Sequence, residues 1–318
     1  TKASKDFFDK YFKPWNASKV SFPKIEAMWG HSYKSKKIYL ENHKLATKDW
    51  FDKQIINSNF DDYNTLTKKA IMLKNTNIRV LPTNSPMFYD PTQPGEGFPF
   101  DYNQNSAIKI NTPIIVSHFS KDRAWAYVES GNVGGWVEIG TIAFVDKKFI
   151  QEFKTSNYFI SVKEKFPIYD PIFREYVKVA TIFPKKGDKY LIAKKDDEQN
   201  ALISYIELND DEIESMPLAF NTENRIKIAK QLLDEPYGWG GLLNNRDCSS
   251  FTQDYFAVFG KYLHRNSKAQ ISNGKYLDMS KLSNDEKKEF MRENGVPFST
   301  LVYLKGHIML YIGAKNNE

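Results

Sequence analysis

The chain has 318 residues, which predicts two or more domains, and its 41% hydrophobic and 15% aromatic content excludes a wholly disordered protein. Its formal charge of +6 comes from scattered Lys and Arg residues; this argues against a dedicated nucleic-acid binder and fits a polyanionic partner such as cell wall or an anionic membrane surface. No run of about 18 apolar residues occurs, so the sequence predicts no transmembrane helix.

Residues 1–68 are predicted to form a helical and irregular extension that clamps onto the other domains. Aromatic residues from Phe7 to Phe12 follow helical spacing, and Pro14 ends that helix. The remainder has too little periodic structure for a large core of its own. The first residues lack the apolar stretch of a signal peptide, so either the protein is cytoplasmic or a targeting segment was removed before this numbering begins.

Residues 69–145 and 146–215 are each predicted to form a small β-barrel. Short β-branched runs such as Pro113–Val116 and Val177–Ala180 recur in both segments, and turn clusters separate them. No close internal sequence repeat links the two segments, so the prediction of two successive barrels rests on the pattern alone.

Residues 216–318 change to a pattern of helices followed by strands, which predicts an α+β domain. The second predicted helix starts at Cys248 and stops at Gly260. The whole chain is therefore predicted to be multidomain α+β, with an N-terminal extension, two β-barrels and a C-terminal α+β domain. The predicted elements of this last domain are a helix capped by Asn221 or Thr222, a helix over 248–259, and strands over 300–304 and 307–312.

Cys248 is the only cysteine, which excludes an internal disulfide framework and a multi-cysteine zinc site but permits a catalytic thiol. The thiolate is the attacking species, and a helix N-terminus lowers the pKa of a thiol. Asp247 can cap the helix, so Cys248 falls in its first turn, where its own backbone N–H can help to hold an oxyanion. An inert buried cysteine is the alternative that these residues leave open.

His307 opens an otherwise apolar predicted strand, where a histidine is unusual as core filling. On a rigid sheet edge it is suited to act as a general base for Cys248. Sequence separation alone does not establish contact, so the pairing stays open at this point. No His, Asp or Glu cluster has the spacing of metal ligands, and the sequence indicates no cofactor.

Four motifs in residues 217–318 follow one another in a characteristic order. They are Pro236–Gly241, Arg246–Phe251, Leu263–Ser267 with Gln270, and Gly306–Gly313. In this order they resemble the NlpC-type cysteine peptidases, which are papain-like enzymes of bacterial cell walls. The resemblance implies a papain-like α+β peptidase domain with Cys248 as nucleophile, His307 as base and Tyr237 in the active site.

Relatives with paired bacterial SH3-like domains cleave the bond between γ-D-glutamate and a diamino acid, so the resemblance implies peptidoglycan stem peptides or muropeptides as partners. By the same resemblance Asp247 and Ser267 bind the stem peptide, with Asp247 facing the free amine of an L-Ala terminus, or Asp247 is simply a helix cap. The implied mechanism is hydrolysis through a Cys–His thioester. A catalytically inactive wall-binding or scaffolding protein, and transfer of the thioester to an amine, are the alternatives.

The front of the chain resembles a subgroup of the same family. Phe8–Trp15 resembles its N-terminal clamp segment, and motifs within 79–137 resemble its first SH3-like domain, which walls one side of the substrate cleft. Asp101, Asp122 and Trp136 are the candidates for substrate contacts from this domain. A tryptophan such as Trp136 is more often part of a barrel core than a ligand contact. The resemblance thus implies that both predicted β-barrels are SH3-like.

In the family a third polar residue, about a dozen positions after the base, orients its imidazole. That position falls just beyond Glu318, and Asn316 and Asn317 come too early. We expect the numbered sequence to stop short of the natural C-terminus; an incomplete triad is the alternative. The resemblance also implies a location in the periplasm or at the cell surface, either outer-membrane-anchored or secreted, while the oligomeric state stays open.

Overall fold

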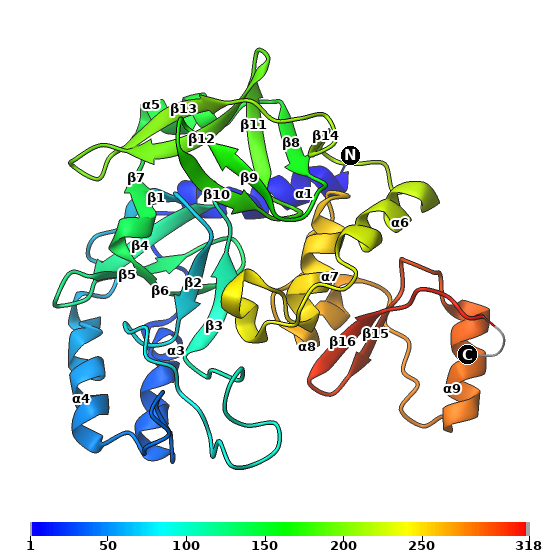
Figure 1. Ribbon diagram of the computed structural model, residues 1–318, viewed down its shortest axis with the longest axis horizontal. Coiled ribbons are helices and arrows are strands. Elements are labelled where there is room, and N and C mark those ends of the chain that lie inside the picture. Colours follow the sequence, from blue (N-terminus) through cyan, green and yellow to red (C-terminus); the bar gives the residue numbers. More distant parts are fainter. Residues whose placement is uncertain (1, 316–318) are drawn as a thin grey trace.

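The computed structural model describes residues 2–315, and its N-terminal segment is a series of short helices joined by irregular stretches (Figure 1). Phe12 and Trp15 are buried, because they pack against both β-rich parts of the chain. The indole Nε1 of Trp15 also donates to the carbonyl of Ala70 at 2.8 Å, which fixes the segment on the neighbouring sheet. The helices are α1 (Lys2–Tyr11), α2 (Lys13–Asn16), α3 (Lys24–Ala27), the 3₁₀ helix η1 (Trp29–Ser35), α4 (Lys48–Asn57) and the 3₁₀ helix η2 (Phe60–Asp62).

Residues 68–144, here called the first β-unit, form one antiparallel sheet in the order β3-β2-β6-β5-β4-β1-β7. All five residues of β5 are buried, since one face lies in the core of the sheet and the N-terminal segment covers the other. The elements are β1 (Lys68–Met72), β2 (Thr76–Arg79), β3 (Gln104–Ile108), β4 (Pro113–Phe119), β5 (Trp125–Glu129), β6 (Gly134–Glu138), the 3₁₀ helix η3 (Ile139–Thr141) and β7 (Ile142–Phe144).

Residues 158–215, here called the second β-unit, combine a sheet in the order β13-β12-β11-β8-β14 with the hairpin β9–β10. Asn111 joins the two units, because its Nδ2 donates to the carbonyls of Ile182 and Leu191 at 3.1 and 3.0 Å. The elements are the connecting helix α5 (Lys147–Phe153), β8 (Tyr158–Ser161), β9 (Phe166–Tyr169), β10 (Phe173–Val177), β11 (Ile182–Lys186), β12 (Lys189–Lys195), β13 (Ala201–Ile206) and β14 (Ile213–Ser215).

The C-terminal region, residues 216–315, combines short helices with one hairpin. Asn221 rather than Thr222 caps the first helix, with its side chain accepting from the N–H of Asn224. The hairpin β15–β16 lies beside α7 (Figure 1). The elements are α6 (Thr222–Gln231), the 3₁₀ helix η4 (Trp239–Asn244), α7 (Cys248–Ala257), α8 (Ser267–Gln270), the 3₁₀ helix η5 (Ile271–Asn273), α9 (Asn284–Asn294), β15 (Leu301–Leu304) and β16 (His307–Leu310).

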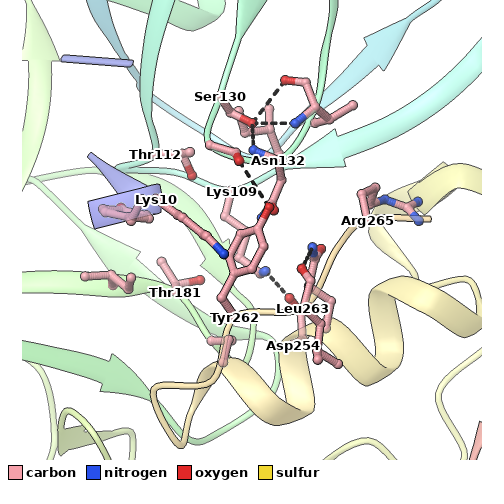
Figure 2. A pocket seen from close by; sticks show the side chains of 18 of the residues that line it. Lys10, Lys109, Thr112, Ser130, Asn132, Thr181, Asp254, Tyr262, Leu263 and Arg265 are labelled. Carbon is pink, nitrogen blue, oxygen red and sulfur yellow. Dashed lines mark hydrogen bonds and ion pairs between the residues drawn. The ribbon is translucent and has the colours of Figure 1, made fainter. Parts of the chain in front are cut away.

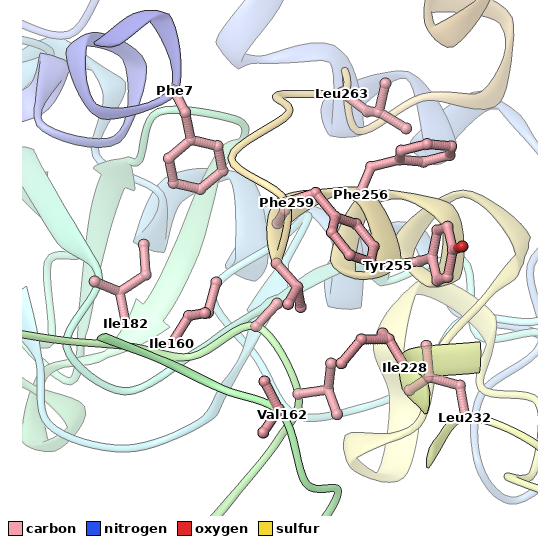
Figure 3. Close-up of a cluster of buried hydrophobic side chains, with 14 residues drawn as sticks. Phe7, Ile160, Val162, Ile182, Ile228, Leu232, Tyr255, Phe256, Phe259 and Leu263 are labelled. Atoms are coloured by element: carbon pink, nitrogen blue, oxygen red, sulfur yellow. The ribbon is translucent and has the colours of Figure 1, made fainter. Parts of the chain in front are cut away.

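A shared hydrophobic core attaches the C-terminal helices to the second β-unit and to α1 (Figure 3). Phe7 of α1 belongs to this core together with Ile160 and Ile182 of the second β-unit, Tyr255 of α7 and Phe259, which follows α7. Burying one large apolar side chain stabilises a fold by about 1.5–3 kcal/mol. This core therefore holds α7 firmly against the second β-unit.

The predicted multidomain α+β class is confirmed, with a helical N-terminal segment, a β-rich middle and a C-terminal α+β region. Sheet membership changes near the predicted boundaries, so we retain as a proposal the division into four domains after residues 68, 145 and 215. The predictions that concern Asn316 and Asn317 lie outside the described residues. Within residues 2–315, no helix has the length and apolar character needed to cross a membrane.

Candidate active site

Helix α7 begins at Cys248, and a capping box formed by Asp247 and Ser250 fixes this start. The Asp247 carboxylate accepts from the N–H of Ser250 at 2.8 Å, and the Ser250 hydroxyl accepts from the N–H of Asp247 at 3.0 Å. These bonds satisfy N–H groups that a helix start leaves without intrahelical partners. Cys248 is the first residue of α7, so it lies at the positive end of the helix dipole. Because it is only partly buried, it is also within reach of solvent.

Cys248 lies in a cleft of about 540 Å³ between the N-terminal segment, the first β-unit and the C-terminal region. Tyr237, Asp247 and Ser267 line the same cleft, so the fold brings together four of the predicted site residues. Every described lining residue comes from these three parts, and the second β-unit contributes none. The walls opposite the nucleophile include Trp29 and Tyr33 of η1, Gln104 of β3 and Tyr127 of β5.

Arg265 is a cleft residue to which we assigned no role from the sequence. Its Nη2 lies 2.6 Å from Oδ2 of Asp247 and its Nη1 lies 3.2 Å from Oδ1, so the guanidinium binds both carboxylate oxygens. Burial opposes the ionised carboxylate, but Arg265 and a hydrogen bond from Ser250 hold the pKa of Asp247 below its usual value. Nε of Arg265 donates to the hydroxyl of Ser106 at 2.7 Å, which joins the pair to the first β-unit. The available signal was its position two residues before Ser267, within the same motif.

Tyr237 is held beside the nucleophile through its backbone. It forms a parallel bridge with Arg246, and the N–H of Gly238 donates to the carbonyl of Arg246 at 2.9 Å. The side chain is half exposed. Burial, followed by the negative charges of Asp247 and Cys248, raises the pKa of Tyr237 to about 12. The phenol therefore keeps its proton at neutral pH and is available as a hydrogen-bond donor.

His307 is the first residue of β16, directly after the hairpin turn at Gly306. Gly306 lines the cleft and has a φ of 84°, in the left-handed region that favours glycine. The imidazole is exposed, and among the residues described no hydrogen bond joins it to the Cys248 thiol. His307 itself does not line the cleft, but it directly follows Gly306, which does, so the hairpin places it next to the edge of the cleft that contains Cys248.

Asp101, Asp122 and Trp136 do not line the cleft, which differs from the expectation that they contact substrate. Asp101 is 3% exposed and pairs with Arg79 at 2.8 Å, as a buried structural carboxylate. Trp136 is 0% exposed and packs in the core between the first β-unit and the N-terminal segment. Asp122 organises a turn, where it accepts from the hydroxyl of Ser120 and from a backbone N–H two residues later. These three residues therefore lie outside the candidate site.

Three protein-family models match separate parts of the chain. Residues 1–63 match the N-terminal stabilising domain of NLPC_P60 proteins, residues 86–138 match an SH3 domain of the SH3b1 type, and residues 234–317 match the NlpC/P60 family. The last range contains Cys248 and His307. The first two ranges contain the lining residues that the N-terminal segment and the first β-unit contribute to the cleft.

A solved structure described as a novel NlpC/P60 endopeptidase from Photobacterium damselae subsp. piscicida is similar over the entire chain. The sequence identity is 27% and the TM-score is 0.91, over 100% of this chain and 78% of that chain. An NlpC/P60 family protein from Bacillus cereus is 17% identical, with a TM-score of 0.48 over 77% of this chain and 88% of that chain. The comparison with curated proteins gave no match. The first likeness extends to the arrangement of all the parts, because it covers the whole chain.

Proposed function

The chain carries a domain of the NlpC/P60 family, whose members are generally cell-wall peptidases, and from this premise we propose that it cleaves the γ-D-glutamyl–diamino acid bond of peptidoglycan stem peptides. The observation that carries the proposal is the position of Cys248 at a helix N-terminus, inside a cleft shared with Tyr237, Asp247 and Ser267. These residues supply a thiol nucleophile, a hydroxyl donor and polar groups for a peptide in one place.

In the proposed reaction His307 takes the proton of the Cys248 thiol, and the thiolate attacks the γ-carbonyl carbon of D-glutamate. A C–S bond forms while the carbonyl π electrons move to oxygen. The C–N bond then breaks, His307 returns the proton to the leaving amine of the diamino acid, and a thioester remains. Water attacks the thioester with His307 as base, which releases the carboxylic acid and restores the thiol.

Two groups are proposed to hold the oxyanion of this reaction. The first is the backbone N–H of Cys248, which belongs to the first turn of α7 and has no intrahelical acceptor. The second is the hydroxyl of Tyr237, which keeps its proton because its pKa is raised to about 12. Together they place one fixed and one side-chain donor beside the thiol.

Asp247 and Ser267 are proposed to bind the stem peptide. Asp247 stays ionised at neutral pH, because Arg265 and the cap hydrogen bond hold its pKa below the usual value. A carboxylate oxygen accepts more than one donor, so Asp247 can bind the free amine of an L-Ala terminus while it caps α7. The two roles that the sequence left open for this residue are therefore compatible.

NlpC/P60 proteins are typically extracellular or cell-wall-associated, and we propose that this one acts in the periplasm or at the cell surface. Stem peptides lie outside the cytoplasmic membrane, which supports this location. The cleft is walled by three parts of the chain, and this favours free muropeptides over intact, crosslinked wall. Parallel digests of intact sacculi and purified muropeptides, read by mass spectrometry, distinguish these two substrates.

Replacing Cys248 with Ala tests the assignment of the nucleophile. Wild-type protein incubated with purified muropeptides is expected to release truncated stem peptides, identified by their masses. Cys248→Ala is expected to lower the rate by roughly 10⁴-fold or more, as loss of a nucleophile does in other hydrolases. Release of the same fragments by this variant at the wild-type rate would show that the nucleophile is another group.

A catalytically inactive wall-binding or scaffolding protein is the second candidate. It is favoured by the lack of a hydrogen bond between His307 and Cys248 in the described part of the chain. Wild-type protein that sediments with sacculi but releases no fragments would establish this candidate. Product masses also separate hydrolysis from transfer, because a transfer product retains the mass of the acceptor amine.

A further inference from the structure

Five charged side chains form one cluster, here called the rear charge cluster, beside the segment 245–248 that leads into α7. None of the five lines the cleft. The proposed reaction uses none of them. Arg246, Glu164 and Asp254 have side chains that are only 5–6% exposed, so their charges are compensated by one another and not by water. The cluster comprises Lys109 of the first β-unit, Glu164 and Lys178 of the second β-unit, and Arg246 and Asp254 of the C-terminal region.

Arg246 is the centre of the rear charge cluster. Its Nη1 and Nη2 donate to the two carboxylate oxygens of Glu164 at 2.7 and 2.9 Å, and its Nε donates to Oδ2 of Asp254 at 2.7 Å. A two-pronged pair of this kind fixes orientation as well as charge. Asp254 lies on α7 itself, so Arg246 ties the segment that enters the helix to the body of the helix.

The backbone around Arg246 reaches both of the proposed catalytic segments. The carbonyl of Arg246 accepts from Gly238 at 2.9 Å, beside the bridge to Tyr237, and Cys248 follows two residues later in the chain. Nζ of Lys178 donates to the carbonyl of the preceding residue, Asn245, at 3.1 Å. The positions of the thiol and of the phenol therefore both depend on this one short segment.

The first β-unit also contacts the rear charge cluster. Lys109 pairs with Asp254 at the wall of a small cavity of about 100 Å³ behind α7 (Figure 2). Burial alone would raise the pKa of Asp254, but the charges of Lys109, Arg246 and Lys178 lower it to about 2. Asp254 therefore stays ionised at neutral pH, and the contacts with Arg246 persist.

We infer that Arg246 is a positioning residue that sets Tyr237 and Cys248 relative to each other, and that Glu164 and Lys178 of the second β-unit hold it in place. The inference rests on the proposed function, since it names the group that aligns the proposed nucleophile with the proposed oxyanion donor. The second β-unit lines no described part of the cleft, so it can affect the chemistry only indirectly, through contacts such as this one. A misplacement of about 1 Å in a reacting group costs roughly 100-fold in rate, which makes a rigid anchor important here.

Two variants test the inference. Glu164→Gln keeps the shape of the side chain and one oxygen acceptor but removes the charged fork. Arg246→Lys keeps a positive charge between the two carboxylates, so it stays informative if the first variant does not fold. The matched control is Ile192→Ala, which makes a cavity in the core of the same β-unit and has no contact with Arg246. Such a cavity destabilises the fold without touching the rear charge cluster.

Alkylation of Cys248 by iodoacetamide is the decisive measurement, because the chain has no other cysteine and the reagent needs no substrate. We expect both variants to alkylate at least about threefold more slowly at pH 7, since a displaced thiol loses its interaction with the positive end of the α7 dipole. On muropeptides we expect kcat to fall about tenfold and KM to change less than about twofold. Ile192→Ala is expected to retain the wild-type alkylation rate and kcat at a temperature where it is folded.

The outcomes separate this inference from the proposed function. Alkylation within about twofold of wild type in both variants overturns the positioning role, whatever the substrate proves to be. An equal loss of alkylation rate and kcat in Ile192→Ala also overturns it, because general loosening would then explain the effect. Slower alkylation in the two variants, combined with no cleavage of muropeptides by wild-type protein, supports the positioning role and contradicts the proposed substrate.

Discussion

The two β-units contact the surroundings of the segment 245–248, which leads into α7, in different ways. The first β-unit contributes Gln104 and Tyr127 to the cleft and bonds to Arg265 through Ser106. The second contributes no described lining residue and instead binds the segment 245–248 through the buried ion pair of Glu164 and Arg246. The first β-unit is therefore placed to contact substrate, although its Lys109 also joins the rear charge cluster, whereas the second is placed to hold the thiol in position.

The electrostatic surroundings of the two contacts differ accordingly. The pair of Arg265 and Asp247 has side chains 16% and 13% exposed, so water and substrate reach it. The side chains of Arg246 and Glu164 are 6% and 5% exposed, so water cannot readily replace either partner of this pair. Substitutions on the cleft side should therefore change rates first, whereas substitutions on the rear side should change stability first.

The largest effect is expected for Arg246→Met, which breaks the rear contact. It leaves Glu164 and Asp254 buried without their shared cation, so the free energy of unfolding should fall by about 3–5 kcal/mol. Urea denaturation measures this loss. Lys163→Met is the control, since its pair with Asp211 is exposed and should change stability by less than about 0.5 kcal/mol. An equal loss in the two variants would remove the distinction between the buried and the exposed pair.

The next largest effect is expected for Arg265→Met, which breaks the cleft contact. Asp247 loses the cation that binds both its oxygens, its pKa should rise, and kcat/KM on muropeptides should fall about 100-fold. The change in stability should be smaller than for Arg246→Met, as urea denaturation would show. Lys268→Met removes an exposed charge from the neighbouring helix and should leave kcat/KM near wild type. A variant of Arg265 with full activity would assign this pair to structure alone.

A smaller effect is expected for Tyr237→Phe, which removes one proposed oxyanion donor but keeps the ring. We expect kcat to fall about tenfold with little change in KM, since the donor acts in the transition state. Because the pKa of Tyr237 is raised to about 12, its ionisation should not reduce wild-type activity between pH 8 and 10. A wild-type activity that falls in this range and is flat in Tyr237→Phe would contradict the assignment. Tyr276→Phe is a matched control at an exposed position.

The smallest effect is expected for Lys178→Met, read as a pH dependence. Burial, followed by the charge of Arg246, lowers the pKa of Lys178 to about 7. Between this pKa and the ordinary value of a lysine the unfolded chain binds more protons, so this group makes stability rise with pH. The stability of the variant relative to wild type should therefore be greater at pH 6 than at pH 9, by on the order of 1 kcal/mol. Equal differences at both pH values would show that Lys178 is charged throughout.

Local features of the site could be predicted from the sequence, whereas contacts between distant segments could not. The start of α7 at Cys248 follows from Asp247 as a cap, which is a matter of neighbouring residues. The pair of Glu164 and Arg246 joins the second β-unit to the C-terminal region, and no local pattern marks it. A sequence also does not distinguish a cleft carboxylate from a buried one, which is why Asp101 was expected to contact substrate.

The order of synthesis gives the packing of α1 a consequence for folding. Phe7 is translated well before the C-terminal region, yet it shares one hydrophobic core with Tyr255 and Leu263 of that region. The side chain of Lys10 likewise covers the ring of Tyr262. Such long-range contacts form late, because the C-terminal region must be synthesised before they can close. Until then the apolar face of α1 stays uncovered and exposed to aggregation, and this core is completed only when the C-terminal region docks.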